Sequence, residues 1–301
     1  MKEKIAVLGG DLRQYAAAVS LSHKDWDVSL WGLELSDNKD ECIRLCKDHI
    51  EAMDGAVGVI LPLPVTSDGV FLNCPFYASQ EKIRLDDILE RVSNNSIIIG
   101  GRMPDAFINK AREKNISVKD YFISEDFQIK NAYITAEAAV SIAMNSLNKN
   151  IRGARIAITG YGRISKHLVR LLMSMGANVT VAARKKSDLA WSMCSGCSVI
   201  RIGDTDDLKN NIYMLSHGFD IIYNTVPHWL FDRGFLEAAD KDTFIVDLAS
   251  VPGGVDICAA KELGTNVLWA TSLPGKYAPV SAGRLIASCV DDILRGEDET
   301  V

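Results

Sequence analysis

Residues 160–165 read Gly-Tyr-Gly-Arg-Ile-Ser, and their types and spacing suit the binding of a phosphate group. An apolar strand is expected before this turn over 154–159, an amphipathic helix after it over 166–175, and a second strand over 178–183. The first glycine permits a sharp bend, and the second lets the backbone approach a pyrophosphate. The helix N-terminus adds free N–H groups and a positive dipole end. This order predicts the first half of a dinucleotide-binding βαβ unit.

Ser165 stands where the third glycine of this pattern is expected. That position controls how closely the helix packs on the strand, and serine is the next smallest choice. A turn between strand and helix that binds nothing remains the alternative. We predict that the dinucleotide contacts the turn and the start of the helix, at Gly160, Tyr161, Gly162, Arg163 and Ile164.

The end of the second strand indicates which dinucleotide binds. A site for NAD places Asp or Glu about 20 residues after the turn, where it binds the ribose 2′-OH. Here the sequence is Ala-Arg-Lys-Lys-Ser over 183–187, without a carboxylate. Arg184 could bind a 2′-phosphate with two hydrogen bonds, Lys185 could add charge and Ser187 could add a hydroxyl. We predict NADP as the cofactor, with NAD possible; a solvated basic loop is the alternative.

The composition excludes several classes of protein. The chain has 301 residues, 48% of them hydrophobic, and a formal net charge of -6. That length and apolar content allow two domains with a core each. No basic tract dominates a region, so a nucleic acid is not an expected partner. No apolar stretch is long enough to predict a membrane span, and we expect a cytoplasmic protein that binds no membrane.

The seven cysteines are odd in number and scattered, as expected of reduced thiols in a cytoplasmic chain. Cys194 and Cys197 have the spacing of half a zinc site, but no second such pair and no histidine pair accompanies them. We expect these thiols to pack among apolar side chains, and we predict no metal site.

Strands and helices are expected to alternate along the chain, which predicts parallel sheets covered by helices on both faces. We predict an α/β fold of two Rossmann-like doubly wound parallel-sheet domains with an interdomain cleft. Residues 1–132 are expected to form an N-terminal substrate-side domain, 133–150 a linker helix and 151–279 the NADP-binding domain. The C-terminal helix, 280–295, is expected to pack back on the first domain.

Ligands of open parallel sheets bind beyond the carboxyl ends of the strands, so the loops there are candidate sites. In the second domain we expect Thr225, Val226 and Pro227 to pass the nicotinamide ribose. Ser250 is expected near the nicotinamide ring.

In the first domain the corresponding loops carry Arg13 and Arg102, and Lys276 follows the last strand of the second domain. If these cations converge on the cleft, they predict an anionic substrate, most simply a carboxylate or dicarboxylate. Three separate surface charges are the alternative.

His228 follows the Asn-Thr-Val-Pro loop and is the first candidate for acid–base catalysis, because histidine titrates near neutral pH. Lys276 and Tyr277 are competing candidates for the proton transfer. A structural histidine beside Trp229 is the alternative.

Six segments together are more specific than the glycine turn alone, and the last two of them, which are long and unusual, are the most specific. The six segments are residues 5–13, 135–139, 160–164, 224–227, 247–256 and 273–279. In these segments, which extend over nearly the whole chain, the sequence resembles the A subunit family of dipicolinate synthase from spore-forming bacteria.

The resemblance implies oxidation of dihydrodipicolinate to dipicolinate (pyridine-2,6-dicarboxylate) during sporulation, with NADP accepting the hydride. It implies a location in the mother-cell compartment and a partner, the flavoprotein-like B subunit of dipicolinate synthase. Thr135, which opens one matching segment, is expected to bind substrate, and we expect a homo-oligomer. Two alternatives stay open: a related dehydrogenase of another small acid, of shikimate or alanine type, and a non-catalytic NADP-binding subunit.

Overall fold

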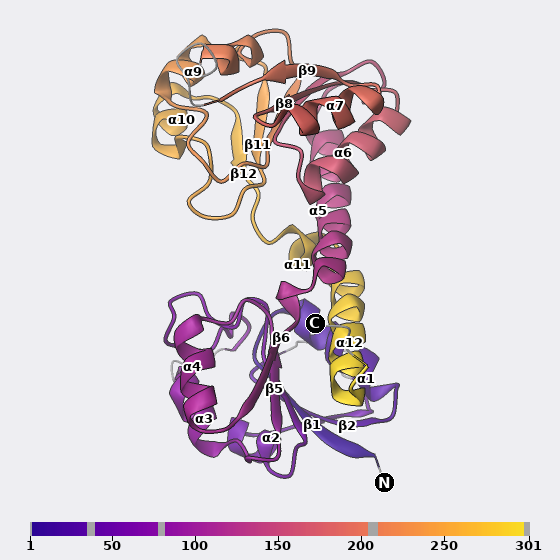
Figure 1. Ribbon diagram of the computed structural model, residues 1–301, viewed down its shortest axis with the longest axis vertical. Helices are drawn as coiled ribbons and strands as arrows, with labels where there is room; N and C mark the ends of the chain where they lie inside the picture. The colour runs from indigo at the N-terminus through magenta and orange to yellow at the C-terminus, as the bar shows by residue number, and fades with distance from the viewer. Residues whose placement is uncertain (1, 35–39, 78–81, 204–209, 298–301) are drawn as a thin grey trace. The chain divides into compact units, whose positions relative to one another are not determined.

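The computed structural model describes residues 2–34, 40–77, 82–203 and 210–297. The chain divides into two compact units. The first unit comprises Met1–Asn131 and Pro274–Val301, and the second comprises Ala132–Leu273. Each unit has one six-stranded sheet with helices against it (Figure 1).

The sheet of the first unit is entirely parallel, with strand order β3-β2-β1-β4-β5-β6. Its strands read as apolar runs because helices cover both faces. β1 and β4 are neighbours although two strands separate them in the chain, so the strand order reverses between them. The strands are β1 (Glu3–Leu8), β2 (Trp26–Trp31), β3 (Ile43–Leu45), β4 (Gly58–Ile60), β5 (Ile97–Gly100) and β6 (Ser117–Asp120).

The sheet of the second unit repeats this topology, with order β12-β11-β10-β7-β8-β9 and parallel pairing throughout. The order reverses between β7 and β10, where a doubly wound fold binds its ligand. The strands are β7 (Arg155–Thr159), β8 (Asn178–Ala183), β9 (Ser198–Arg201), β10 (Ile221–Asn224), β11 (Phe244–Asp247) and β12 (Val267–Trp269). The predicted pair of doubly wound parallel sheets is therefore confirmed.

Helices connect the strands in both units. In the first unit they are α1 (Leu12–Ser22), α2 (His49–Met53), α3 (Leu85–Arg91), α4 (Asp105–Glu113), the 3-10 helix η1 (Tyr121–Ile123) and α12 (Pro279–Arg295). In the second they are α6 (Arg163–Ser174), α7 (Lys186–Cys194), the 3-10 helix η2 (Asn210–Leu215), α9 (Arg233–Ala238) and α10 (Ile257–Leu263). Two helices, α5 (Glu125–Ser146) and α11 (Leu273–Tyr277), include residues of both units. None of the helices that the structure describes is long and apolar enough to cross a membrane.

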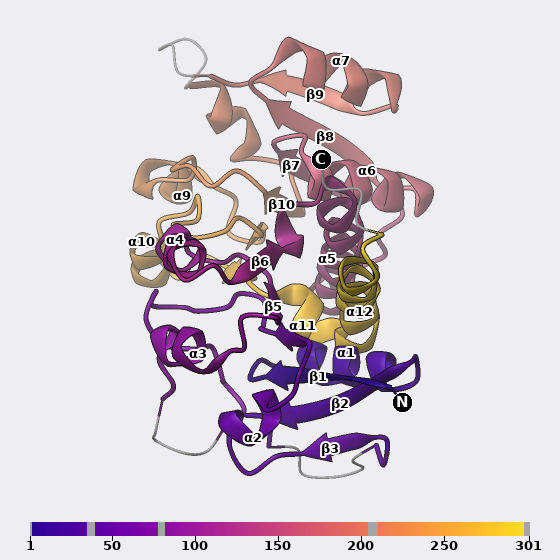
Figure 2. The same cartoon turned by 60° about the horizontal axis from the view of Figure 1, so that its bottom comes forward.

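The C-terminal helix α12 packs along α1 in the first unit, and the two helices lie side by side in Figure 1 and Figure 2. Gly283 makes this close packing possible, because a Cβ there would lie 2.5 Å from both the Ala16 Cβ and the Arg13 carbonyl oxygen. Asp291 of α12 adds polar contacts to the first unit. Its carboxylate accepts hydrogen bonds from Lys24 Nζ at 2.6 Å and from Trp26 Nε1 at 2.7 Å.

The structure differs from the expected elements at several places. The linker helix expected over 133–150 is α5, which begins earlier, at Glu125, and ends at Ser146. The segment 271–279, expected to be a loop, contains the short helix α11 with Lys276 and Tyr277 at its end. The short strands β3 and β9 have no expected counterpart, because each contains an arginine and exposed positions in place of a continuous apolar run.

Candidate active site

The glycine turn joins β7 to α6 where the strand order of the second sheet reverses. Gly160 has φ +81°, and a Cβ there would lie 2.9 Å from both Thr225 Oγ1 and Val226 Cγ2. Gly162 is the N-cap of α6, and open space surrounds the position of its missing Cβ. The N-terminus of α6 is thus accessible to a phosphate. Tyr161, Arg163 and Ile164 flank this turn, with Arg163 exposed.

Ser165, the departure from the glycine pattern, is fully buried. Its hydroxyl lies 2.9 Å from Thr225 Oγ1, and Thr225 Oγ1 donates to the Thr159 carbonyl at 2.8 Å. The serine therefore links α6 to the loop after β10. A glycine at this position would pack closely without a side chain. The Ser165 hydroxyl makes a hydrogen bond instead, so serine is compatible with the turn.

A buried polar network fixes the loops that follow β10 and β11. Asn224 and Asp247, the last residues of these strands, are 0% and 1% exposed. Asn224 Nδ2 donates to Asp247 Oδ1 at 2.8 Å, and Thr159 Oγ1 donates to Asn224 Oδ1 at 2.6 Å. The amides of Ala249 and Gly254 donate to the Asp247 carboxylate at 3.0 and 2.8 Å. These hydrogen bonds satisfy a buried carboxylate and position both loops.

The network was not predicted from the sequence. Asp247 and Asn224 occur in segments that looked specific, but nothing in their spacing shows that β10 and β11 are neighbours. The available signal was a polar residue at the carboxyl end of each of two otherwise apolar strands.

A cavity of about 890 Å³ opens beside the turn. Its volume is within the range of cofactor sites. Six of the residues predicted to serve the site line this cavity: Gly160, Arg184, Lys185, Val226, Pro227 and His228. An accessible helix N-terminus, a glycine backbone and this volume together fit a dinucleotide.

Cationic side chains stand where the cavity meets the end of β8. Arg184 and Lys185 are exposed, and Lys185 is the N-cap of α7. The strand ends at Ala183, so no carboxylate occupies the position that would bind a ribose 2′-OH. Asp188, in the first turn of α7, also lines the cavity. Ser187 is exposed in the same turn but does not line the cavity.

His228 and Trp229 form another part of the cavity wall. Both side chains are exposed, and that of His228 makes no hydrogen bond within the described part of the chain. Ser250 is exposed after β11 and is not among the lining residues. His228 is thus accessible to a ligand without an orienting partner from the described residues.

The first unit has its own buried cation at the point where its sheet reverses order. Arg13, in the first turn of α1, is only 7% exposed. Its Nη2 donates to Asp11 Oδ2 at 2.7 Å and to the Leu63 carbonyl at 2.6 Å, and its Nε donates to Asp11 at 3.0 Å. Nη1 makes no hydrogen bond with the described residues, so one side of the guanidinium remains available to an anion.

Asp11 positions this arginine. Its carboxylate also accepts the Arg13 amide at 2.9 Å, as the N-cap of α1. Gly275 of α11 lies against the pair, since a Cβ there would be 2.9 Å from Arg13 Nε and 3.0 Å from Asp11 Oδ2. The glycine therefore allows α11 to approach the arginine.

Two buried polar atoms near Arg13 have no hydrogen-bond partner among the described residues: Gln14 Oε1 and Tyr121 Oη. Burial raises the pKa of Tyr121, and the nearby Arg13 charge lowers it only in part. Tyr121 is therefore a neutral donor at physiological pH. Neither residue is among those predicted from the sequence.

The remaining predicted substrate and proton-transfer residues lie on different elements. Arg102 is exposed, has φ +56° and lies over the Phe122 ring at 5.5 Å. Lys276 and Tyr277 are exposed on α11, in the first unit, whereas His228 belongs to the second. Thr135 is buried in α5.

Three comparisons with known proteins bear on this geometry. Residues 4–122 match the family model for the N-terminal domain of the dipicolinate synthase A subunit. The chain is 29% identical to the A subunit of dipicolinate synthase from Bacillus subtilis over 291 residues, which cover 97% of this chain and 95% of that protein.

Solved structures agree with the sequence comparisons. The crystal structure of the dipicolinate synthase A subunit from Bacillus halodurans superimposes with a TM-score of 0.81 at 26% identity, covering 98% of each chain. An L-alanine dehydrogenase shares the fold at 10% identity, with a TM-score of 0.64 over 97% of this chain and 88% of that one. Together, the matching N-terminal domain and the likeness over the full length show that this chain is similar to the A subunit of dipicolinate synthase.

Proposed function

We propose that this chain is an NADP-dependent dehydrogenase that oxidises dihydrodipicolinate to dipicolinate. One observation carries the proposal: Gly160 of the turn that leads into α6, Arg184 and Lys185 all line a single cavity at the switch point of the second sheet. The similarity to the A subunit of dipicolinate synthase suggests the substrate class. A dehydrogenase-type fold alone would admit many acids.

The proposed cofactor contacts follow from this cavity. Gly160 and Gly162 give the pyrophosphate access to the turn, and the N–H groups of the first turn of α6 bind it. Arg184 and Lys185 pair with the 2′-phosphate, and Ser187 adds a hydroxyl at the start of α7. Thr225, Val226, Pro227 and Ser250 border the nicotinamide half.

The reaction removes a hydride and a proton from a dihydropyridine ring, and the aromatic product supplies driving force. A nicotinamide held by the residues around the cavity would supply the hydride acceptor. The task of the chain is to hold the ring in place, exclude water and accept one proton. We assign the proton to His228 first, with Lys276 and Tyr277 as the alternatives.

Substrate carboxylates require cations. Arg13 is oriented by Asp11 and offers Nη1, so it is the strongest candidate of the set to bind a carboxylate. Arg102 and Lys276 are exposed and add positive charge, and Thr135 adds a hydroxyl group. A dicarboxylate suits a site with more than one cation.

The same similarity is the basis for proposals on biological context. We propose that the chain works with the B subunit of dipicolinate synthase as its partner, that it forms a homo-oligomer, and that it acts in the mother-cell cytoplasm during sporulation.

The proposal is tested by incubating the purified chain with freshly generated dihydrodipicolinate, L-alanine or shikimate, each with NADP⁺ or NAD⁺. The expected result is reduced cofactor and dipicolinate from dihydrodipicolinate, with NADP⁺ preferred. Turnover only after addition of the B subunit would mean that the partner completes the enzyme. Activity on alanine or shikimate instead, or silence with the B subunit present, would overturn the proposal.

A further inference from the structure

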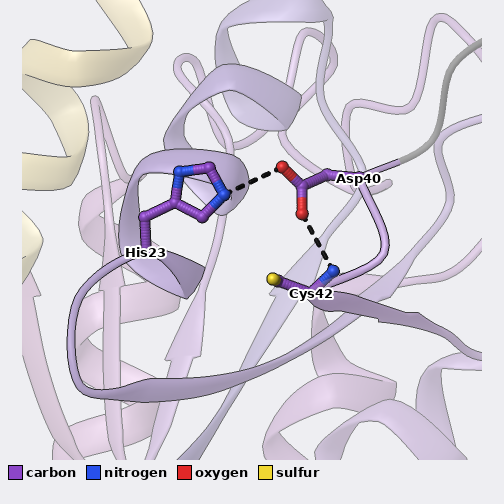
Figure 3. Close-up of side chains that lie close together, drawn as sticks. All are labelled: His23, Asp40 and Cys42. Atoms are coloured by element: carbon purple, nitrogen blue, oxygen red, sulfur yellow. Dashed lines mark hydrogen bonds and ion pairs between the residues drawn. The ribbon is translucent and has the colours of Figure 1, made fainter.

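Three potential metal ligands of different chemistry meet on the surface of the first unit, and none of them is assigned to the dehydrogenase reaction. His23 is the C-cap of α1, and Asp40 and Cys42 lie in the segment that leads into β3 (Figure 3). One ligand atom of each residue lies within 4.8 Å of the others. His23 and Cys42 are distant in sequence, which is why cysteine spacing alone predicts no metal site.

The donor set matches zinc. An imidazole nitrogen, a carboxylate oxygen and a thiolate are its usual ligands, at about 2.0–2.3 Å. In a tetrahedral site such bonds place neighbouring ligand atoms roughly 3.3–3.8 Å apart. His23 Nε2 and Asp40 Oδ2 are already 3.0 Å apart. Closing the remaining separations to Cys42 requires a shift of about 1 Å, within the reach of side-chain rotation.

Asp40 is held in position from two sides. Its Oδ1 accepts the Cys42 amide at 2.9 Å, which brings the thiol back toward the carboxylate. Its own amide donates to the Tyr15 hydroxyl of α1 at 3.0 Å. These contacts fix the segment against the same helix that carries His23, so the three ligands are brought together before a metal binds.

The second unit contains a His–Asp contact that can be compared with the contact between His23 and Asp40. His217 Nδ1 and Asp240 Oδ1 are also close, at 2.8 Å. Among the described residues, only the group around His23 combines three close metal-ligand side chains. The Cys42 thiol, and not the His–Asp contact, therefore distinguishes the group around His23 from the pair His217–Asp240.

We propose that His23, Asp40 and Cys42 form a zinc site, in which Zn²⁺ binds Nε2, a carboxylate oxygen and the thiolate, with water in the fourth position. The thiol releases its proton to solvent as the Zn–S bond forms. His23 and Cys42 are exposed, so the ion can reach the ligands. The bound metal would join the end of α1 to the segment before β3, independently of the proposed dehydrogenase activity.

The test uses the full chain, freed of any affinity tag and of metal, titrated with Zn²⁺ and separately with Co²⁺. We expect one zinc per chain and, with cobalt, a thiolate-to-metal charge-transfer band together with the visible bands of a tetrahedral site. Cys42→Ser should remove the charge-transfer band, and His23→Ala should weaken zinc binding roughly tenfold or more.

Two matched variants serve as controls. Cys258→Ser removes another exposed thiol, and His217→Ala breaks the other His–Asp contact; both should bind zinc like the parent chain. Zinc binding in the parent chain no stronger than in the Cys42→Ser, His23→Ala double variant would overturn the proposal. A cobalt complex without the charge-transfer band would do the same. Circular dichroism checks that each variant is folded.

Discussion

At the scale of single residues, Arg184 is the residue that we propose selects NADP⁺ over NAD⁺. It borders the cavity where β8 ends without a carboxylate. We predict that Arg184→Asp weakens NADP⁺ binding about 10- to 100-fold, the loss of a charge-assisted hydrogen bond, and leaves NAD⁺ binding equal or stronger. Isothermal titration calorimetry with NADP⁺ and with NAD⁺ measures both affinities.

The control for charge alone is Lys261→Asp, on α10 and away from the cavity-lining residues. That variant should leave both affinities unchanged. An unaltered NADP⁺ preference in Arg184→Asp would remove the arginine from the 2′-phosphate site.

Arg13 is the residue through which substrate binding can be tested. Lysine keeps the positive charge but lacks the planar fork that Asp11 and the Leu63 carbonyl hold in place. Arg13→Lys should therefore raise KM for dihydrodipicolinate about tenfold or more, with NADP⁺ affinity unchanged because the cofactor cavity belongs to the second unit. Steady-state kinetics and cofactor titration separate the two effects, and an unchanged KM would exclude Arg13 from the substrate site.

Residue types at strand ends were readable from the sequence, whereas their partners were not. The turn around Gly160 and the cations after β8 follow from local order and spacing. The pairing of Ser165 with Thr225, and the Asn224–Asp247 network, depends on which strands become neighbours. Such contacts arise only from tertiary structure.

At the scale of elements, Asp291 of α12 accepts hydrogen bonds from Lys24 and Trp26 and so joins α12 to the start of β2. Burial alone would raise the pKa of this carboxyl, but hydrogen bonds from Lys24, Trp26 and Arg295 outweigh burial and lower it. A carboxyl with a lowered pKa stabilises the fold above its unfolded pKa, and this contribution is lost as the pH falls through the lower, folded value.

We predict that Asp291→Asn lowers the free energy of unfolding by about 2–3 kcal/mol at neutral pH. The difference from the parent chain should shrink as the pH falls from about 4, the pKa of an unfolded Asp, through the lower pKa of Asp291 in the folded chain. Urea unfolding followed by circular dichroism over a pH series measures it. A difference that stayed constant down to strongly acidic pH would contradict the assignment.

The main elements were predictable because each long strand and helix has its own apolar pattern. α5 extends beyond its expected start because residues 125–133 are mixed in polarity, and only packing shows that they continue the helix. α11 contains Pro274 and Gly275, which locally favour a turn. Gly275 is explained by the nearby Arg13 and Asp11, a tertiary contact.

At the scale of the whole molecule, each unit has its own core and its own switch point. We assign the cofactor to the second unit and the substrate carboxylate to the first. We predict that NADP⁺ slows hydrogen exchange at residues 160–165 and at the start of α7, whereas dipicolinate slows it around Arg13. Exchange measured by mass spectrometry with each ligand alone tests this division, and protection of the same peptides by both ligands would contradict it.

On the proposed function, this chain moves a hydride from dihydrodipicolinate to NADP⁺. The most direct measurement uses dihydrodipicolinate deuterated at its saturated ring carbons and follows the label by mass spectrometry. We predict deuterium in the reduced cofactor, with one reduced cofactor formed for each dipicolinate. Formation of dipicolinate with an unlabelled or unreduced cofactor, with or without the B subunit, would contradict the claim.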